Sequence, residues 1–236
     1  GFKPAWWLSS PHLQTLWPLL FKKYHKLELQ AEQVELDDGD FLDICWSQKV
    51  VEKTVLVLHG LEGSRSSHYI NGIMYRLEKS GYRPVLMHFR GCSGRLNRLP
   101  RAYHSGETED LAFIVEHIKD KTGSYPYGVL GYSLGGNVLL KWLGETGISN
   151  PVQKAVAVSV PFRLKDAARR LEEGLSRIYR EYLLRSLRKT YIEKFKKIKS
   201  PIDVDVSLLK SFWDYDDRVT APLHGFSGAE EYYAMC

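Results

Sequence analysis

The sequence predicts an α/β fold, in which helices flank a mostly parallel sheet. Four apolar runs occur along the chain, and segments of helical periodicity separate them. Such runs are typical of parallel strands that are buried on both faces and joined by helices. A hairpin-like region precedes the first run, and a long helical insertion follows the fourth. With 236 residues, 44% of them hydrophobic, the chain can bury one sizeable core.

The chain begins with an aromatic, partly helical segment, residues 1–26. Ser10–Pro11 is typical of a helix start. The apolar positions that share one face of this helix are Leu13, Leu16, Trp17 and Leu20. We expect the segment to be a strap packed on the core. The alternative is an amphipathic helix on a membrane surface.

Residues 27–46 read as an antiparallel hairpin. Apolar residues alternate from Leu27 to Leu36, and a second short run ends at Trp46. Asp38–Gly39 between them supplies a turn.

The parallel sheet follows the hairpin. The four runs are 54–60, 83–91, 127–133 and 154–161, and helices are expected after the first three, at about 66–80, 106–119 and 135–143. We therefore divide the chain into three parts. These are a strap and α/β core (1–161), a helical cap (162–200) and a return to the core (201–236).

The cap carries the basic character of the chain. Residues 163–199 hold 13 Lys/Arg and 5 Asp/Glu, although the whole chain has a net charge of only +5. A solvated helical face is the simpler interpretation, and a surface for anionic substrates or lipid head groups is the alternative. No recognition motif accompanies the charge, so nucleic-acid binding is not expected. An insertion at this point is placed to cover the strand ends, where open sheets bind ligands.

The three cysteines, Cys45, Cys92 and Cys236, include no CxxC pair. This fits reduced thiols in a cytoplasmic protein, and neither a zinc site nor another cofactor is implied. No apolar run approaches the length of a transmembrane helix. The sequence does not specify the oligomeric state.

A catalytic motif lies at the end of the third run. Gly131-Tyr132-Ser133-Leu134-Gly135 matches G-x-S-x-G between a strand and a helix, which is the pattern of a nucleophile elbow. A Cβ at either glycine would strike the neighbouring strand or helix. We therefore expect Ser133 to be a nucleophile. The simpler alternative is a packed turn in which Ser133 caps the helix.

A nucleophile elbow works with an oxyanion hole. The amide of Leu134, directly after the nucleophile, is one expected donor. The other comes from the loop after the first parallel strand, His59-Gly60-Leu61-Glu62-Gly63, where Leu61 is the candidate. His59 is expected to shape this loop without doing chemistry.

Several stretches together resemble the YheT-like esterases, or α/β-hydrolase family 4, within the α/β-hydrolase superfamily. They are PHLQT (11–15), HGLEGS (59–64), MHFRGCSG (87–94), NRL (97–99), YHSGETED (103–110) and GYSLGGN (131–137). The resemblance covers nearly the whole chain. It implies a serine hydrolase of carboxylic esters, with Ser133 as nucleophile and the amides of Leu61 and Leu134 as oxyanion donors. It implies a structural role for residues 104–110.

The superfamily's acid and histidine follow the nucleophile on later strands. No apolar strand follows residue 201, so we expect a truncated chain whose last strands, acid and base are missing. Asp217 and His224 are internal candidates in the correct order. They are only seven residues apart, which leaves no room for the helix that separates acid and base in the fold, so we do not favour them.

The expected activity is hydrolysis of short- to medium-chain acyl esters through an acyl-enzyme, competent only with the missing Asp and His. The expected partner is a small acyl ester or lipid, and the basic cap is the surface that would contact a membrane. Two alternatives remain open. One is an acyltransferase with an alcohol acceptor, and the other is a non-catalytic, hydrolase-like binding module.

Overall fold

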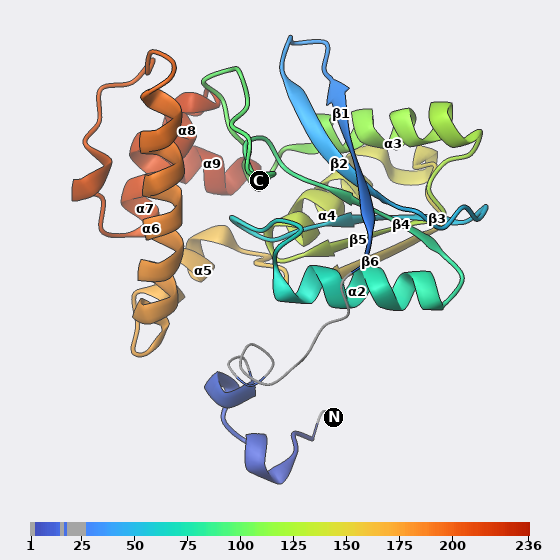
Figure 1. Cartoon of the computed structure of the whole chain (residues 1–236). Coiled ribbons are helices and arrows are strands. Elements are labelled where there is room, and N and C mark those ends of the chain that lie inside the picture. Colours follow the sequence, from blue (N-terminus) through green and yellow to red (C-terminus); the bar gives the residue numbers. More distant parts are fainter. Residues whose placement is uncertain (1–2, 15–16, 18–26) are drawn as a thin grey trace.

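A six-stranded sheet with the order β1-β2-β4-β3-β5-β6 forms the centre of the computed structural model, which describes residues 3–14, 17 and 27–236 (Figure 1). The strands are β1 (Leu29–Glu35), β2 (Phe41–Ser47), β3 (Thr54–Leu58), β4 (Arg83–Met87), β5 (Gly128–Tyr132) and β6 (Lys154–Val158). β3 pairs in parallel with β4 and β5, and β5 pairs in parallel with β6. The α/β fold with a mostly parallel sheet is confirmed.

The hairpin is also confirmed, because β1 and β2 pair antiparallel in the register Leu29↔Ser47 to Glu35↔Phe41. β2 then joins the main sheet through an antiparallel pairing with β4. The hairpin is thus an edge extension of the parallel sheet.

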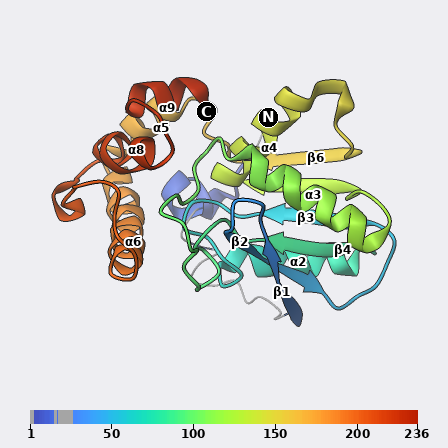
Figure 2. The same ribbon diagram turned by 90° about the horizontal axis from the view of Figure 1, so that it is seen from above.

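Helices cover both faces of the sheet (Figure 2). They are α2 (His68–Lys79), α3 (Thr108–Thr122) and α4 (Leu134–Thr146), with the short η2 (Gly147–Ser149) after α4. Leu56 and Leu58 of β3 pack in one apolar cluster with α3 and α4, whereas Val57 packs in another with α2. Alternate side chains of one strand thus serve two cores, as the continuous apolar runs predicted.

The fourth run differs from the expectation that every apolar run is buried. β6 lies at the edge of the described sheet, and Val156 is 51% exposed. Within the described residues β6 pairs with β5 only, so one of its two edges has no strand beside it. The fourth apolar run is thus confirmed as a strand.

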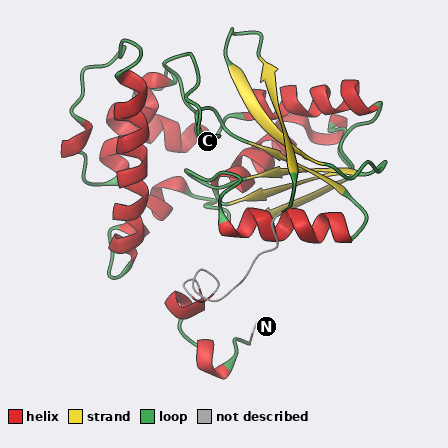
Figure 3. Cartoon of the chain, viewed as in Figure 1, coloured by secondary structure: helices red, strands yellow, loops and turns green. Residues whose placement is uncertain are grey.

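A helical cap stands at one end of the sheet (Figures 1 and 3). The predicted cap (162–200) contains α5 (Leu164–Leu171) and α6 (Ser176–Phe195). The segment after it contains η3 (Val206–Leu208), α7 (Phe212–Tyr215), the π-helical η4 (Asp216–Thr220), α8 (Ala221–Leu223) and α9 (Ala229–Met235). Leu184 and Tyr191 of α6 share an apolar cluster with Phe212 and Val219. The domain boundary at residue 200 stays a prediction, since this cluster continues past it.

The N-terminal segment contains the short η1 (Trp6–Leu8) and lies beside the start of α6. His12 stacks on Tyr179 with ring centroids 6.0 Å apart. Two predicted strap positions, Leu16 and Leu20, lie outside the described residues. Among the helices that the structure describes, none is both long and apolar enough to cross a membrane.

Candidate active site

Ser133 sits at a sharp turn between β5 and α4. Its φ of 50° and ψ of −118° place a non-glycine residue in a backbone region that L-residues rarely adopt. Two hydrogen bonds fix the turn. The Ser133 N–H donates to the Val158 carbonyl at 2.8 Å, and the Ser133 carbonyl accepts from the Asn137 N–H at 3.0 Å. The positive end of the α4 dipole therefore lies at this serine.

The glycines around Ser133 are required by close backbone contacts. A Cβ on Gly131 would lie 2.4 Å from the Gly135 carbonyl oxygen, and one on Gly135 would lie 2.5 Å from the His59 carbonyl oxygen. A Cβ on Gly136 would lie 2.7 Å from a methyl of Val160. The elbow is therefore packed directly against the end of β3.

The loop after β3 reaches the same point, because β3 and β5 are parallel neighbours. A Cβ built on Gly60 would lie 3.2 Å from the Ser133 Cβ. In the described part of the chain, the N–H groups of Leu61 and Leu134 donate to no other protein group. Both predicted donors thus come from segments that meet at Ser133. The sheet order also reverses here, since β4 and β5 lie on opposite sides of β3, and such a switch point is where α/β sheets bind ligands.

His59 is a structural residue. Its Nδ1 donates to the Gly60 carbonyl at 2.7 Å, and its Nε2 accepts from the Phe89 N–H at 3.1 Å. Burial lowers its pKa to about 3, which keeps the ring neutral. The imidazole thereby ties the loop after β3 to the end of β4.

Glu62, to which the sequence assigned no role, is the most constrained residue of this loop. It has a φ of 52°, and its N–H donates to Tyr103 Oη at 2.8 Å. Its carboxylate accepts hydrogen bonds from the hydroxyls of Tyr103, Ser186 and Thr190, each at 2.9 Å. Ser186 and Thr190 belong to α6, so Glu62 joins the loop after β3 to the cap.

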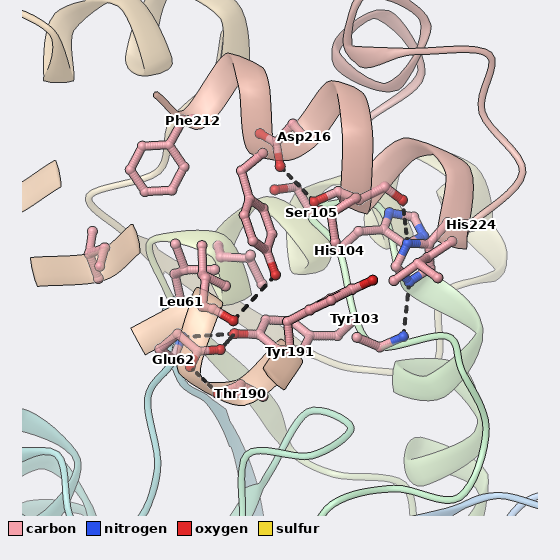
Figure 4. A pocket seen from close by; sticks show the side chains of 18 of the residues that line it. Leu61, Glu62, Tyr103, His104, Ser105, Thr190, Tyr191, Phe212, Asp216 and His224 are labelled. Atoms are coloured by element: carbon pink, nitrogen blue, oxygen red, sulfur yellow. Dashed lines mark hydrogen bonds between the residues drawn. The ribbon is translucent and has the colours of Figure 1, made fainter. Parts of the chain in front are cut away.

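A cavity of 460 Å³ lies between the cap and the ends of the strands, and Ser133 and Leu134 line it. Most of its wall is apolar, and α5, α6 and α7 contribute Leu164, Leu171, Leu183, Leu187 and Phe212 to it. Glu62, Tyr103 and Thr190 lie on one side of it, and His104 and His224 on the other (Figure 4). Its size is typical of a small-molecule site.

The structure does not pair the internal candidates Asp217 and His224. The Asp217 carboxylate accepts from the Ala229 N–H at 2.9 Å. His224 donates from Nδ1 to the Thr220 carbonyl at 2.7 Å, and its Nε2 accepts from the Ala102 N–H at 3.3 Å. Both ring nitrogens are occupied, and burial lowers the pKa of this histidine.

The His104 ring packs at a tilt of 60° against that of His224, with ring centroids 4.7 Å apart. Burial together with that neighbour lowers the pKa of His104 to about 3. Its Nδ1 accepts from the Gly106 N–H at 3.1 Å. Among the described residues, no histidine hydrogen-bonds to the Ser133 hydroxyl. A general base for Ser133 is therefore not identified in this part of the chain.

Two motifs noted in the sequence are joined by buried ion pairs. Arg90 donates to Asp110 from Nε at 2.8 Å and from Nη2 at 2.6 Å, and to Asp38 and Asp40 from Nη1. Asp110 lies in the 103–110 stretch, whose residues the sequence assigned to structure. These contacts tie the hairpin turn, β4 and α3 together.

Lys194 of α6 is a second residue that the sequence did not reveal. It is only 4% exposed, and its Nζ donates to Asn97 Oδ1 at 2.8 Å and to the Arg101 carbonyl at 2.6 Å. Burial lowers its pKa to about 8. This lysine docks the cap on the loop after β4. The described residues contain no group of three or more His, Cys, Asp or Glu arranged to hold a metal ion.

Comparison with known proteins identifies the family. A model described as alpha/beta hydrolase fold matches residues 53–227. The chain belongs to the α/β-hydrolase family. A protein of Escherichia coli (strain K12) named "Putative esterase YheT" is 40% identical over 242 residues, which cover 100% of this chain and 71% of that protein. The resemblance to YheT-like esterases is thus confirmed.

More distant α/β-hydrolases agree. "Phospholipase ABHD3" of Homo sapiens is 28% identical over 98% of this chain, which spans 59% of that protein. The solved structure of Pyrococcus furiosus esterase Pf2001 has a TM-score of 0.55 and 23% identity, covering 74% of this chain and 69% of that one. The latter similarity supports the fold alone.

Proposed function

We propose that this α/β-hydrolase is a serine hydrolase of carboxylic esters. The observation that carries the proposal is the strained backbone of Ser133 at the start of α4, beside the loop after β3. Ser133 Oγ attacks the ester carbonyl carbon, and the amides of Leu61 and Leu134 bind the resulting oxyanion. The alcohol leaves with a proton, and water then hydrolyses the acyl-enzyme to the free acid and Ser133.

The serine proton needs a base, because a hydroxyl is a weak nucleophile until a histidine accepts its proton. The occupied nitrogens of His59 and His224 favour a base outside residues 1–236. We therefore propose that an Asp or Glu and a His beyond this chain complete the triad. Asp217 and His224 remain the less favoured internal pair.

The cavity supports an acyl group of short to medium length, because its wall is mostly apolar and its volume is 460 Å³. A cytoplasmic location is part of the proposal, and the free state of Cys45, Cys92 and Cys236 supports it.

A fluorophosphonate probe tests the proposal directly. We expect an adduct on Ser133 in the full-length protein and none in the 236-residue chain, with the modified peptide located by mass spectrometry. An adduct in both would assign the base to this chain, with His224 as the leading candidate. No adduct in either would favour a binding module. Product analysis with added alcohol separates hydrolysis from acyl transfer.

Glu62 is expected to act as a positioning residue for the Leu61 amide. In Glu62→Gln one acceptor oxygen becomes an NH2 donor, so the side chain can no longer accept hydrogen bonds from Tyr103, Ser186 and Thr190 together, and the strained loop relaxes. We expect kcat to fall by about tenfold to a hundredfold, because a displaced oxyanion donor weakens transition-state binding. KM should change by less than about threefold, since the interaction is made in the transition state.

Glu173→Gln provides the matched control for Glu62→Gln, because Glu173 is an exposed glutamate of the cap that does not line the cavity. Ser133 labelling by the fluorophosphonate should slow in parallel with kcat only in Glu62→Gln. Equal losses of kcat in both variants, or a change confined to KM, would contradict the proposal that Glu62 positions the Leu61 amide.

We further propose that the cap contacts an anionic membrane surface. Trp6, Phe162, Ile178 and Tyr182 are 90%, 79%, 66% and 76% exposed, and the His12–Tyr179 contact brings the N-terminal segment beside α6. Tryptophan and tyrosine are typical of the membrane interface, where lysine and arginine also bind anionic lipids. The surrounding cap supplies the excess of Lys and Arg.

Vesicle sedimentation tests this contact. The triple variant Arg163→Gln, Lys165→Gln and Arg169→Gln should bind phosphatidylserine-containing vesicles roughly a hundredfold more weakly, at about 1 kcal/mol per charge. Vesicles of phosphatidylcholine alone are the control and should show no difference. A vesicle affinity that does not change with salt concentration, or no binding to the vesicles, would contradict the proposal.

A further inference from the structure

A second hollow lies beside the cavity and is here called the basic groove. It has a volume of 1010 Å³. Most of its lining comes from three segments, namely the loop after β3 (Glu62 and 64–66), the loop after β4 (91–96), and the second half of α6 with the residues directly after it (186–197). Phe41 of β2 completes the lining. No function has been assigned to it above.

Positive charge dominates the lining of the groove. Its basic residues are Arg65, Arg95, Lys189, Lys196 and Lys197, and its acidic residues are Glu62 and Glu193. The Glu62 carboxylate already accepts three hydroxyl hydrogen bonds, and Arg95 is paired with Asp43. Within the described residues, Lys196 and Lys197 have no carboxylate partner. The groove therefore keeps an excess of cationic groups for a ligand.

The basic groove and the apolar cavity adjoin each other. Glu62, Gly91, Leu96 and Thr190 line both of them. The cavity also contains Ser133, so an ester could place its acyl group there while an anionic group on its alcohol side extends into the groove. The hydroxyls of Ser64 and Ser66 add hydrogen-bond donors to the cationic lining.

We propose that the basic groove binds the phosphate of a phosphate-bearing acyl ester. This inference rests on the proposed esterase function and defines its substrate class. A phosphate carries one to two negative charges and several acceptor oxygens, which lysine, arginine and hydroxyl groups satisfy through charge-assisted hydrogen bonds. Because the groove and the apolar cavity adjoin, a molecule that carries both an acyl group and a phosphate can occupy the two at once. Neutral esters of the same chain length would use the cavity alone.

The experiment measures binding, so that it does not depend on turnover. The full-length protein with Ser133→Ala is titrated calorimetrically with a lysophosphatidate and with a monoacylglycerol of the same short acyl chain, both below the concentration at which they form micelles. The groove variant combines Lys189→Gln, Lys196→Gln and Lys197→Gln. The control variant combines Lys53→Gln, Lys79→Gln and Lys154→Gln, which removes the same charge from exposed positions of the α/β core that line neither hollow.

We expect the groove variant to bind the lysophosphatidate about tenfold or more weakly, while its affinity for the monoacylglycerol is unchanged. The control variant should keep both affinities. High salt should weaken the binding of the lysophosphatidate and leave that of the monoacylglycerol unchanged. Equal losses in the groove and control variants would show a general effect of charge and overturn the proposal. So would an unchanged affinity for the lysophosphatidate in the groove variant.

Free phosphate is distinguished from a substrate phosphate by a further titration. Inorganic phosphate alone should bind at least about tenfold more weakly than the lysophosphatidate, because it makes no contact in the apolar cavity. Equal affinity would indicate a free-phosphate site and overturn the substrate assignment. Fluorophosphonate labelling of Ser133 in the full-length protein tests the esterase proposal without involving the groove. The failure of one proposal can therefore be distinguished from the failure of the other.

Discussion

Replacing Ser133 with alanine is expected to lower ester hydrolysis by about three to six orders of magnitude, because the acyl-enzyme cannot form without its hydroxyl. The fold should survive, since the fixed contacts of this residue are made by its backbone N–H and carbonyl. An alanine must adopt the same φ of 50°, as serine does, so the strain is common to both proteins. Turnover of a chromogenic ester in the full-length protein, together with the thermal midpoint, checks this result.

His224→Ala is the informative companion to Ser133→Ala. It removes a cavity-lining histidine whose nitrogens are held by backbone groups of Thr220 and Ala102. We expect turnover to stay within about threefold of the unmodified protein, because the proposed base is a different histidine. A loss as large as that of Ser133→Ala would move the base to His224. Residual hydrolysis near the normal rate in Ser133→Ala would reject the serine mechanism altogether.

Gly135→Ala is expected to destabilise the protein by about 2–4 kcal/mol, through overpacking at a site that cannot relax. The new methyl would lie 2.5 Å from the His59 carbonyl oxygen and 2.8 Å from the Leu58 Cβ. Both groups belong to the central strand or its first loop residue, so the elbow and the loop after β3 must separate. Denaturant unfolding measures the loss, and fluorophosphonate labelling measures the accompanying change at Ser133.

Gly144→Ala is the matched control in the same helix. A Cβ there meets nothing within 4 Å, and alanine is the better helix former. This variant should be unchanged or more stable by about 0.5–1 kcal/mol. If the two alanines had equal effects on unfolding, close packing at the elbow would not be what requires Gly135.

Local patterns predicted most of the core. Continuous apolar runs predicted the parallel strands, and alternating apolar residues predicted the hairpin. Both predictions succeed because the faces of a strand that are buried can be recognised from the strand's own residues. β6 shows where this reasoning fails. Its residues 154–158 match the pattern of a strand covered on both faces, but which segments cover a strand is set by the rest of the fold, and among the described residues only β5 pairs with it.

The candidate site was predictable to the same extent. Ser133 and the loop containing Leu61 stand next to strand ends, so the motif and the strand order place them together. Glu62 and Lys194 were missed because their partners lie on distant segments. Lys194 also looks like any surface lysine of a basic helix, and only the docking of α6 shows that it is buried.

The order of segments along the chain has a consequence for how such proteins diversify. The loop after β3 and the elbow at Ser133 are complete before the chain enters the cap near Pro161. α5 and α6 supply much of the cavity wall but none of the three proposed reacting groups. Insertions, deletions or exchanges within the cap can therefore change which molecules are admitted while the inherited chemistry stays intact. An exchanged cap would still need hydrogen-bond donors for the Glu62 carboxylate, as the Ser186 and Thr190 hydroxyls now provide.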